Sequence, residues 1–250
     1  MDEDRAGPGR RRLYGRRQGR KLRPGRQALL DRLLPRLCIE PPPPGADCDP
    51  RDLFASECFD FRPKTVWIEV GFGAGEHLAA QARTHPEIGL IGCEPYLHGI
   101  AALLGAVDGE GLDNIRLYPG DAADLIDGLA EASVGRLFVL FPDPWPKTRH
   151  HKRRFVRAPV VAACARVLAD GAEMRLATDH AEYCRWMLAH MLDDGAFEWL
   201  ARGPEDWRQR PQDWPETRYE AKARAAGARP MFLRFRRRAR VPTGAAPEND

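Results

Sequence analysis

The chain has 250 residues, of which 43% are hydrophobic and 30% charged, and its formal net charge is +3. This length allows one substantial α/β core, and a single domain is expected. The longest purely apolar runs, such as 137–141 and 160–164, span about five residues, whereas a bilayer-spanning helix requires roughly 20. The first residues also lack the apolar stretch of a secretory signal. A membrane protein is therefore not expected, and the predicted location is cytoplasmic.

Cysteines are scattered singly along the sequence. The six of them form no CxxC pair and no Cys/His group at zinc spacing. We therefore predict no metal site and free thiols in a reducing compartment at Cys38, Cys48, Cys58, Cys93, Cys164 and Cys184.

Basic residues gather in three segments despite the small net charge. Residues 5–26 hold ten Lys or Arg and no acid, residues 147–157 hold six together with two histidines, and residues 234–240 hold five. Clustered cations suit a polyanion such as RNA, because each Lys or Arg brought to a phosphate releases condensed counterions. For the N-terminal segment, a solvated basic tail is an equal alternative.

The chain begins with a segment of low hydrophobicity. Residues 1–27 combine Gly, Arg and Pro and are predicted to be a disordered basic extension, and the four prolines at 41–44 cannot join a helix or a central strand. Apolar residues at helical spacing predict one short helix over 27–37. A single domain is expected over 28–240, followed by a disordered tail over 241–250.

From residue 66 onward, short apolar runs alternate with helical patterns. Helices are predicted near 76–84, 96–106, 122–130, 158–168, 180–193 and 218–226. Strands are predicted at 66–70, 88–93, 115–118, 137–141, 172–177, 197–201 and 230–235. Strands separated by helices need crossover connections, which give a mostly parallel sheet covered on both faces. Seven strands with a late return strand resemble the Rossmann-like class I methyltransferase fold, an α/β fold whose last strand is antiparallel.

The first of these strands runs into a glycine-rich turn and then a helix. Glu69 lies at the strand end, and Gly71, Gly73 and Gly75 let the backbone turn sharply and approach a ligand closely. A dinucleotide fingerprint would place its third glycine at Glu76, where a carboxylate disfavours a diphosphate. S-adenosylmethionine carries an ammonium and a sulfonium, so Glu69 is predicted to face its methionyl part. The turn resembles the first motif of class I methyltransferases; a purely structural tight turn is the alternative.

Two further acids follow the next two strands. Glu94 comes 19 residues after Gly75 and is placed to accept both ribose hydroxyls of the cofactor. Asp121 is placed to accept a hydrogen bond from the adenine amino group. Each acid separately could instead be a helix N-cap, because Asp and Glu favour first turns. Three acids at three successive strand ends favour a shared site.

A proline-rich loop follows the strand predicted at 137–141. Its sequence is Pro-Asp-Pro-Trp-Pro-Lys, residues 142–147, and a basic run comes next. Each proline fixes its own φ and restricts the residue before it, so the loop is expected to be stiff. Stiffness suits a carboxylate, Asp143, and an aromatic ring, Trp145, that must be held against a planar base. A proline-rich turn with a tryptophan in the core is the alternative.

This hexapeptide resembles the signature of the bacterial tRNA (guanine-N7)-methyltransferase family, and the similarity extends from about residue 29 to residue 235. The resemblance implies S-adenosylmethionine as cofactor and tRNA as partner. It implies that Asp143 is the active-site acid beside the methyl group and that Lys147 contacts the substrate. By the same resemblance, the RNA-contacting residues would be Arg149, His150, His151, Lys152, Arg153 and Arg154. The further substrate-binding residues would be Asp179, Thr217, Arg218, Tyr219 and Glu220.

Local structural roles remain open for some of these residues. Thr217 and Glu220 have the spacing of a capping box, in which the two side chains satisfy the first backbone NH groups of a helix. Asp179 precedes a predicted helix and could be its N-cap. A capping role and a substrate role can hold together.

The resemblance leads to a hypothesis of mechanism. N7 of guanine has a lone pair and no proton, so catalysis reduces to alignment and electrostatics. Methylation leaves the purine cationic, which favours a carboxylate such as Asp143 nearby, and Asp143, Asp179 and Glu220 could accept from N1–H and N2–H. The resemblance also implies nucleotide 46 of the variable loop as the target.

Two other functions remain open. One is a class I methyltransferase acting on another RNA, a protein or a small molecule. The other is a non-catalytic RNA-binding subunit with a degenerate cofactor fold. Neither the composition nor the motifs indicate an obligate protein partner.

Overall fold

The computed structural model describes residues 19–55 and 61–241. Its α-helices are α1 Pro24–Leu37, α2 Glu76–Thr84, α3 Leu97–Glu110, α4 Ala122–Gly128, α5 Ala158–Val167, α6 Ala181–Asp193, α7 Glu205–Arg208 and α8 Arg218–Ala225. Two 3-10 helices, η1 Pro50–Phe54 and η2 Thr148–Arg153, accompany them. Within these ranges no helix has the length and apolar character needed to cross a membrane. Most of the two segments predicted to be disordered, and Cys58, lie outside the described residues.

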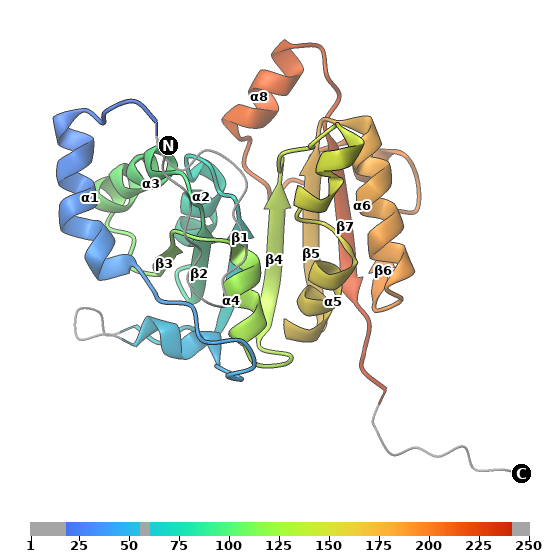
Figure 1. The fold of residues 1–250 in the computed structure, drawn as a ribbon, viewed down its shortest axis with the longest axis horizontal. Coiled ribbons are helices and arrows are strands. Elements are labelled where there is room, and N and C mark those ends of the chain that lie inside the picture. Colours follow the sequence, from blue (N-terminus) through green and yellow to red (C-terminus); the bar gives the residue numbers. More distant parts are fainter. Residues whose placement is uncertain (1–18, 56–60, 242–250) are drawn as a thin grey trace, which may run out of the picture.

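Seven strands form one sheet in the order β3-β2-β1-β4-β5-β7-β6 (Figure 1). They are β1 Thr65–Val70, β2 Ile88–Cys93, β3 Ile115–Tyr118, β4 Val134–Leu140, β5 Leu168–Thr178, β6 Phe197–Trp199 and β7 Met231–Arg237. β7 pairs antiparallel with both β5 and β6, and the other pairs are parallel. The predicted fold class, a mostly parallel α/β sheet with an antiparallel last strand, is confirmed.

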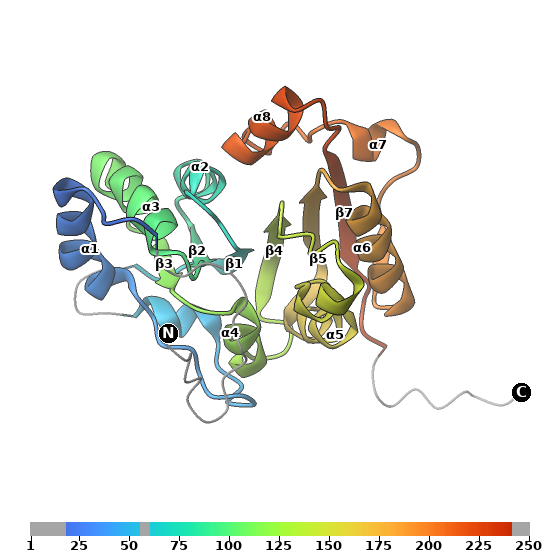
Figure 2. The same ribbon diagram turned by 45° about the horizontal axis from the view of Figure 1, so that its top comes forward.

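Two hydrophobic cores cover the two faces of the sheet. Alternate residues of β1 point to opposite faces, so Ile68 packs among α4, α5 and α6 while Trp67 packs among α1, α2 and α3. β4 repeats this pattern, with Val139 in the first core and Phe138 in the second. The turned view in Figure 2 shows the two helical layers on either side of the strands. A sheet buried on both faces explains the nearly continuous apolar runs of its strands.

Some element bounds differ from the sequence prediction for local reasons. α1 begins at Pro24, within the segment predicted to be disordered, because proline is well suited to the first turn of a helix. β5 begins at Leu168 rather than residue 172, and its pairing with β4 is irregular between Val134 and Arg136. η1, η2 and α7 were not predicted, since such short elements carry too little periodicity.

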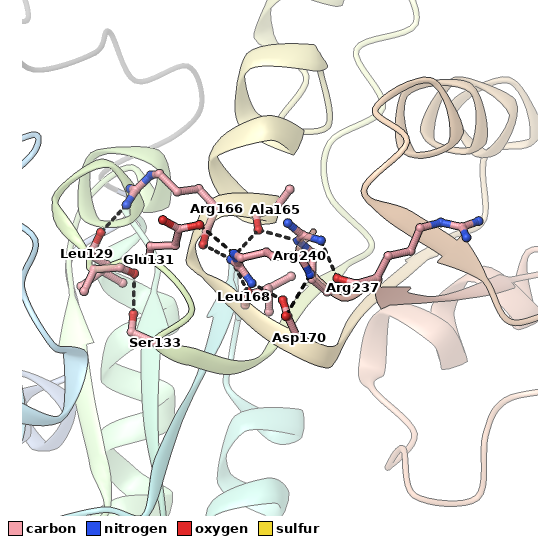
Figure 3. Close-up of polar contacts among 11 residues, drawn as sticks. Leu129, Glu131, Ser133, Ala165, Arg166, Leu168, Asp170, Arg237 and Arg240 are labelled. Carbon is pink, nitrogen blue, oxygen red and sulfur yellow. Dashed lines mark hydrogen bonds and ion pairs between the residues drawn. The ribbon is translucent and has the colours of Figure 1, made fainter. Parts of the chain in front are cut away.

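Arginines secure the edge of the sheet opposite the strands' carboxyl ends (Figure 3). Arg166 donates to the carbonyls of Ile126 (2.8 Å) and Leu129 (2.5 Å) at the end of α4. Arg240 donates to the carbonyls of Arg166 (2.6 Å) and Leu168 (3.0 Å) at the end of α5. These guanidinium groups satisfy carbonyls that a helix end leaves unpaired.

Carboxylates and a third arginine complete this edge. Arg240 forms ion pairs with Glu131 and Asp170, and Arg237 Nε donates to the carbonyl of Ala165 at 2.8 Å. Because β7 runs antiparallel, its end brings Arg237 and Arg240 to this edge. The interpretation of residues 234–240 as a polyanion-binding cluster is thereby corrected for these two arginines, whose charges are already engaged within the fold.

Candidate active site

A pocket of about 660 Å³ lies at the carboxyl ends of β1, β2, β3 and β4. Parallel strands place the residues that follow them at one edge of the sheet, where ligands bind in open α/β folds. α8 extends beyond the end of β4 on this side of the molecule (Figures 1 and 2). The predicted site residues that line the pocket are Gly71, Gly73, Glu94, Asp121, Asp143, Lys152, Arg153, Arg154 and Tyr219.

The glycine-rich turn has a backbone that only glycine adopts easily. Gly71, Gly73 and Gly75 have φ values of 66°, 60° and 82°. A Cβ added to Gly73 would lie 2.6 Å from the Tyr219 ring, and one added to Gly99 of α3 would lie 2.1 Å from the Gly73 carbonyl oxygen. Helices α3 and α8 therefore both approach the turn closely. Gly75 is the N-cap of α2 and is not part of the pocket lining.

Glu94 joins the turn to the following strand. One carboxylate oxygen accepts from the Gly73 amide and the other from the Tyr96 amide, each at 2.9 Å. Burial raises the pKa of Glu94, the two amides act in the opposite direction, and the negative charges of Asp143 and Glu69 raise it further. Each carboxylate oxygen has a second lone pair, so Glu94 can accept hydroxyl groups in addition to these amides.

Glu69 lies beneath the pocket rather than in its lining. Its side chain is 3% exposed, and Oε2 lies 2.8 Å from Nδ1 of His77, which is 1% exposed. Glu69 was predicted to face the methionyl part of a cofactor. The pocket lining begins at the next residue, Val70, and does not include Glu69. The strand-end position was foreseen, but its buried histidine partner was not.

Asp121 combines the two roles considered for it. Oδ1 accepts from the Ala123 amide at 3.0 Å and caps α4, and the residue also lines the pocket. A carboxylate at a helix N-terminus is favoured by the helix dipole and by the free amides. Capping fixes the side chain at the pocket wall.

The proline-rich loop holds Asp143 between two strained residues. Phe141 and Trp145 have φ values of 52° and 42°, which residues with a Cβ rarely adopt. Asp143 is exposed and lines the pocket. Such strain persists only where the surrounding structure imposes it, and it is concentrated at functional sites. The sequence did not reveal this strain; the stiffness expected from the prolines stays a prediction.

Arg154 anchors this loop from below. Its side chain is 0% exposed, Nε donates to the Pro144 carbonyl at 2.8 Å, and the guanidinium pairs with both oxygens of Glu182 on α6. The guanidinium also lies over the ring of Tyr183, 4.9 Å from its centroid, and that of Trp186, at 4.7 Å. The prediction that Arg154 contacts RNA is corrected, because its charge and its donors are engaged inside the protein.

The other residues of the basic run are exposed or partly exposed. Arg149 and Lys152 are exposed, and Arg153 lies over the Trp145 ring at 4.9 Å. Lys152 and Arg153 line the pocket, whereas Lys147, Arg149, His150 and His151 lie outside its lining. The pocket mouth is therefore bordered by cations on the η2 side.

The predicted substrate residues further along the chain have mixed placements. Asp179 is exposed and outside the pocket lining, and the N-cap of α6 is His180 rather than Asp179. Thr217 Oγ1 accepts from the Glu220 amide at 3.2 Å and caps α8, which is the threonine half of the predicted capping box, whereas the Glu220 carboxylate pairs with arginines. Among the four residues Thr217 to Glu220, Tyr219 lines the pocket.

Charged partners hold both ends of the first turn of α8. Glu220 is 1% exposed, and Oε1 lies 3.1 Å from Nε of Arg210 and 2.8 Å from a terminal nitrogen of Arg224. Arg218 Nε lies 3.4 Å from Oε1 of Glu76 on α2. Acceptance of guanine N1–H and N2–H by Glu220 would have to compete with these two arginines.

Several lining residues were not singled out from the sequence. Val70, Tyr96, Phe141, Phe155 and Arg157 all border the pocket. Membership of the basic run was the one feature of the sequence that pointed to Arg157. The others are apolar or aromatic residues, a type equally typical of the core.

The sequence is similar to known methyltransferases over most of its length. A family model described as "Putative methyltransferase" matches residues 63–233. The tRNA (guanine-N(7)-)-methyltransferase of Rhodospirillum rubrum is 50% identical over 233 residues, covering 92% of this chain and 89% of that protein. Proteins of the same name from Nitrobacter hamburgensis and Paracoccus denitrificans are 46% and 44% identical, covering 90% and 95% of this chain and 86% and 100% of theirs.

Proposed function

The chain belongs to the tRNA (guanine-N(7)-)-methyltransferase family, and we propose that it transfers a methyl group from S-adenosylmethionine to N7 of a guanine in tRNA. The observation that carries this proposal is that Glu94, Asp121 and Asp143 line one pocket whose mouth is bordered by Lys152 and Arg153. A methyltransferase for small molecules needs the same carboxylates but has no need for cations at the pocket mouth.

The residues at the pocket suit S-adenosylmethionine. Gly73 leaves no room for a side chain between the turn and the Tyr219 ring, so the backbone itself borders the ligand space. Glu94 and Asp121 offer acceptors for hydroxyl and amino groups, while Glu76, in the first turn of α2, disfavours a phosphate there. When bound, this cofactor supplies an electrophilic methyl group on a sulfonium.

Asp143 would act on the acceptor side. Guanine N7 attacks with its lone pair and needs no base, so the protein contributes alignment and charge. As the purine becomes cationic, a carboxylate held in place by the strained loop stabilises the developing charge without having to reorganise. Tyr219 is an exposed ring at the same pocket and would face the base.

The basic run would position the tRNA. Arg149 and Lys152 are exposed and can reach phosphates, which fixes the register of the RNA without reading its sequence. Lys147 and Asp179 are also exposed and would contact the substrate. We place the reaction at nucleotide 46 of the variable loop and in the cytoplasm.

Methyl transfer into defined tRNA transcripts tests this proposal. Labelled methyl should enter a transcript with guanine at position 46 and should not enter the same transcript carrying 7-deazaguanine there, because that base has no N7 nitrogen. Asp143→Ala should lower turnover by about 100-fold while tRNA binding persists. Asp193→Ala, an exposed acid on α6 outside the pocket lining, is the matched control. Equal labelling of both transcripts, or unchanged turnover of Asp143→Ala, would refute the assignment.

A further inference from the structure

A buried polar chain runs from beneath the pocket to the segment before α8. It starts at the Glu69 carboxylate, passes through His77 and Gln81 of α2, and ends at the backbone carbonyl of Asp213. The three contacts measure 2.8 Å, 3.3 Å and 3.0 Å. Glu69, His77 and Gln81 are each at most 3% exposed. Because their partners lie within the protein and not in water, each contact matters for the placement of the next group.

The donors and acceptors of this chain agree at every step. With the His77 proton placed on Nδ1, Glu69 accepts from Nδ1–H, and Nε2 is left as an acceptor. The amide nitrogen of Gln81 has two hydrogens, one for His77 Nε2 and one for the Asp213 carbonyl. Gln81 therefore joins α2 to the segment before α8 by a hydrogen bond, and a side chain without two donors could not make both contacts.

The same segment is tied to α8 on its other side. Arg210 donates to the Trp214 carbonyl at 2.5 Å and to Glu220 Oε1 at 3.1 Å. Trp214, which is 2% exposed, packs against His77 and against Phe232 of β7. A displacement of residues 213–214 would therefore move Glu220 and the rest of the first turn of α8.

That turn carries Tyr219, which overhangs the pocket. Its ring is so close to Gly73 that a Cβ there would lie 2.6 Å from it. We propose that Gln81 is a positioning residue, which fixes residues 209–217 to α2 and thereby places Tyr219 and the first turn of α8 over the pocket. The proposal rests on the proposed function for its catalytic consequence, since the placed groups face the acceptor.

Hydrogen exchange and kinetics of the full-length protein test this role together. Gln81→Met keeps the length of the side chain and removes its donors. Amide exchange across 209–225 should become about fivefold faster in the ligand-free protein, as expected for the loss of one hydrogen bond of ordinary strength. kcat for tRNA should fall by a similar factor of about five, while KM for tRNA changes less than about twofold, because the phosphate-binding cations are untouched.

Two further variants make the outcome decisive. Gln27→Met removes an exposed hydrogen bond to Asp31 on α1, 2.8 Å in length, and should leave exchange and kcat unchanged. Arg210→Gln removes the arginine that connects the Trp214 carbonyl to Glu220 and leaves the buried chain intact. This variant takes the place of Gln81→Met if Gln81→Met fails to fold. Unchanged exchange over 209–225, or unchanged kcat, in the folded variant overturns the proposal. Absence of tRNA methylation by the unmodified protein would instead refute the proposed function, and the exchange result would still decide whether Gln81 fixes this segment.

Discussion

Two arginine-rich segments with similar composition have different roles in this fold. Residues 147–157 lie beside the pocket and leave Arg149 and Lys152 exposed, and Arg154 is the one basic residue among them that is fully buried. Residues 234–240 lie at the other end of the sheet, where Arg237 and Arg240 donate to the carbonyls that end α5. The difference follows from the surroundings: helix ends with unpaired carbonyls engage guanidinium groups, whereas beside the pocket Arg149 and Lys152 remain exposed to solvent.

The comparison predicts a separation of effects. Substitutions at the pocket edge should alter activity and RNA binding, and substitutions at the opposite edge should alter stability. Arg154 is the exception, because it is at the pocket edge and is nevertheless built into the fold.

The largest effect should come from Arg154→Ala. Its removal leaves the Pro144 carbonyl and Glu182 without their buried partner, and we expect a loss of about 3 kcal/mol of unfolding free energy together with reduced turnover. Arg154→Lys should rescue little, because an ammonium cannot pair with both carboxylate oxygens in the planar geometry of arginine. Urea unfolding and turnover are the measurements, and Arg149→Ala is the exposed control for the unfolding measurement alone. A variant with native stability would show that Arg154 does not anchor the loop.

Arg240→Ala should have the next largest effect, on stability alone. Three carbonyls at the end of α5 lose a charged donor, so the free energy of unfolding should fall by about 2 kcal/mol. Its affinity for tRNA at a fixed salt concentration should equal that of the unmodified protein. Arg238→Ala, which loses one long hydrogen bond of 3.3 Å to Phe197, should be nearly neutral. Weakened tRNA binding by folded Arg240→Ala would contradict the comparison.

Charge removal at Lys152 and Arg153 should alter RNA binding more than stability. If each cation contacts one phosphate, each substitution to glutamine should reduce the slope of log K against log salt by about one. Titrations of tRNA at several salt concentrations measure this slope. An unchanged slope of log K against log salt in the double variant would exclude phosphate contacts at these positions.

The smallest effect concerns the pH dependence of cofactor binding. Burial raises the pKa of Glu94 above its ordinary value of 4.5, and hydroxyl donors favour the ionised carboxylate. The raised pKa means that the folded protein favours the protonated form of Glu94. The stability that protonated Glu94 contributes is therefore lost as the pH rises through this pKa. Affinity for S-adenosylhomocysteine should rise over the same interval, because the ligand selects the ionised form. Calorimetry at several pH values should show this rise, and Glu94→Gln should abolish it.

Local patterns in the sequence predicted the framework of the site. The turn of Gly71, Gly73 and Gly75 was recognisable because it follows an apolar strand, and positive φ values explain the glycines. Asp121 and Asp143 could be placed at the pocket because carboxyl ends of parallel strands share one edge. These inferences depend on neighbours in the chain, and such neighbours are visible in a sequence.

Contacts between distant segments could not be predicted in the same way. Glu69 was expected to face a ligand, but the chain gives no sign that His77 would turn back from α2 to meet it. Arg154 is one of several consecutive cations, and only the arrival of Glu182 and Trp186 on α6 distinguishes it. The sequence by itself determined the succession of the main strands and helices along the chain and the acids at the strand ends, because these follow from periodicity and backbone geometry. Only the tertiary structure decided which charges are engaged within the protein and which remain for a ligand, because that depends on partners far away along the chain.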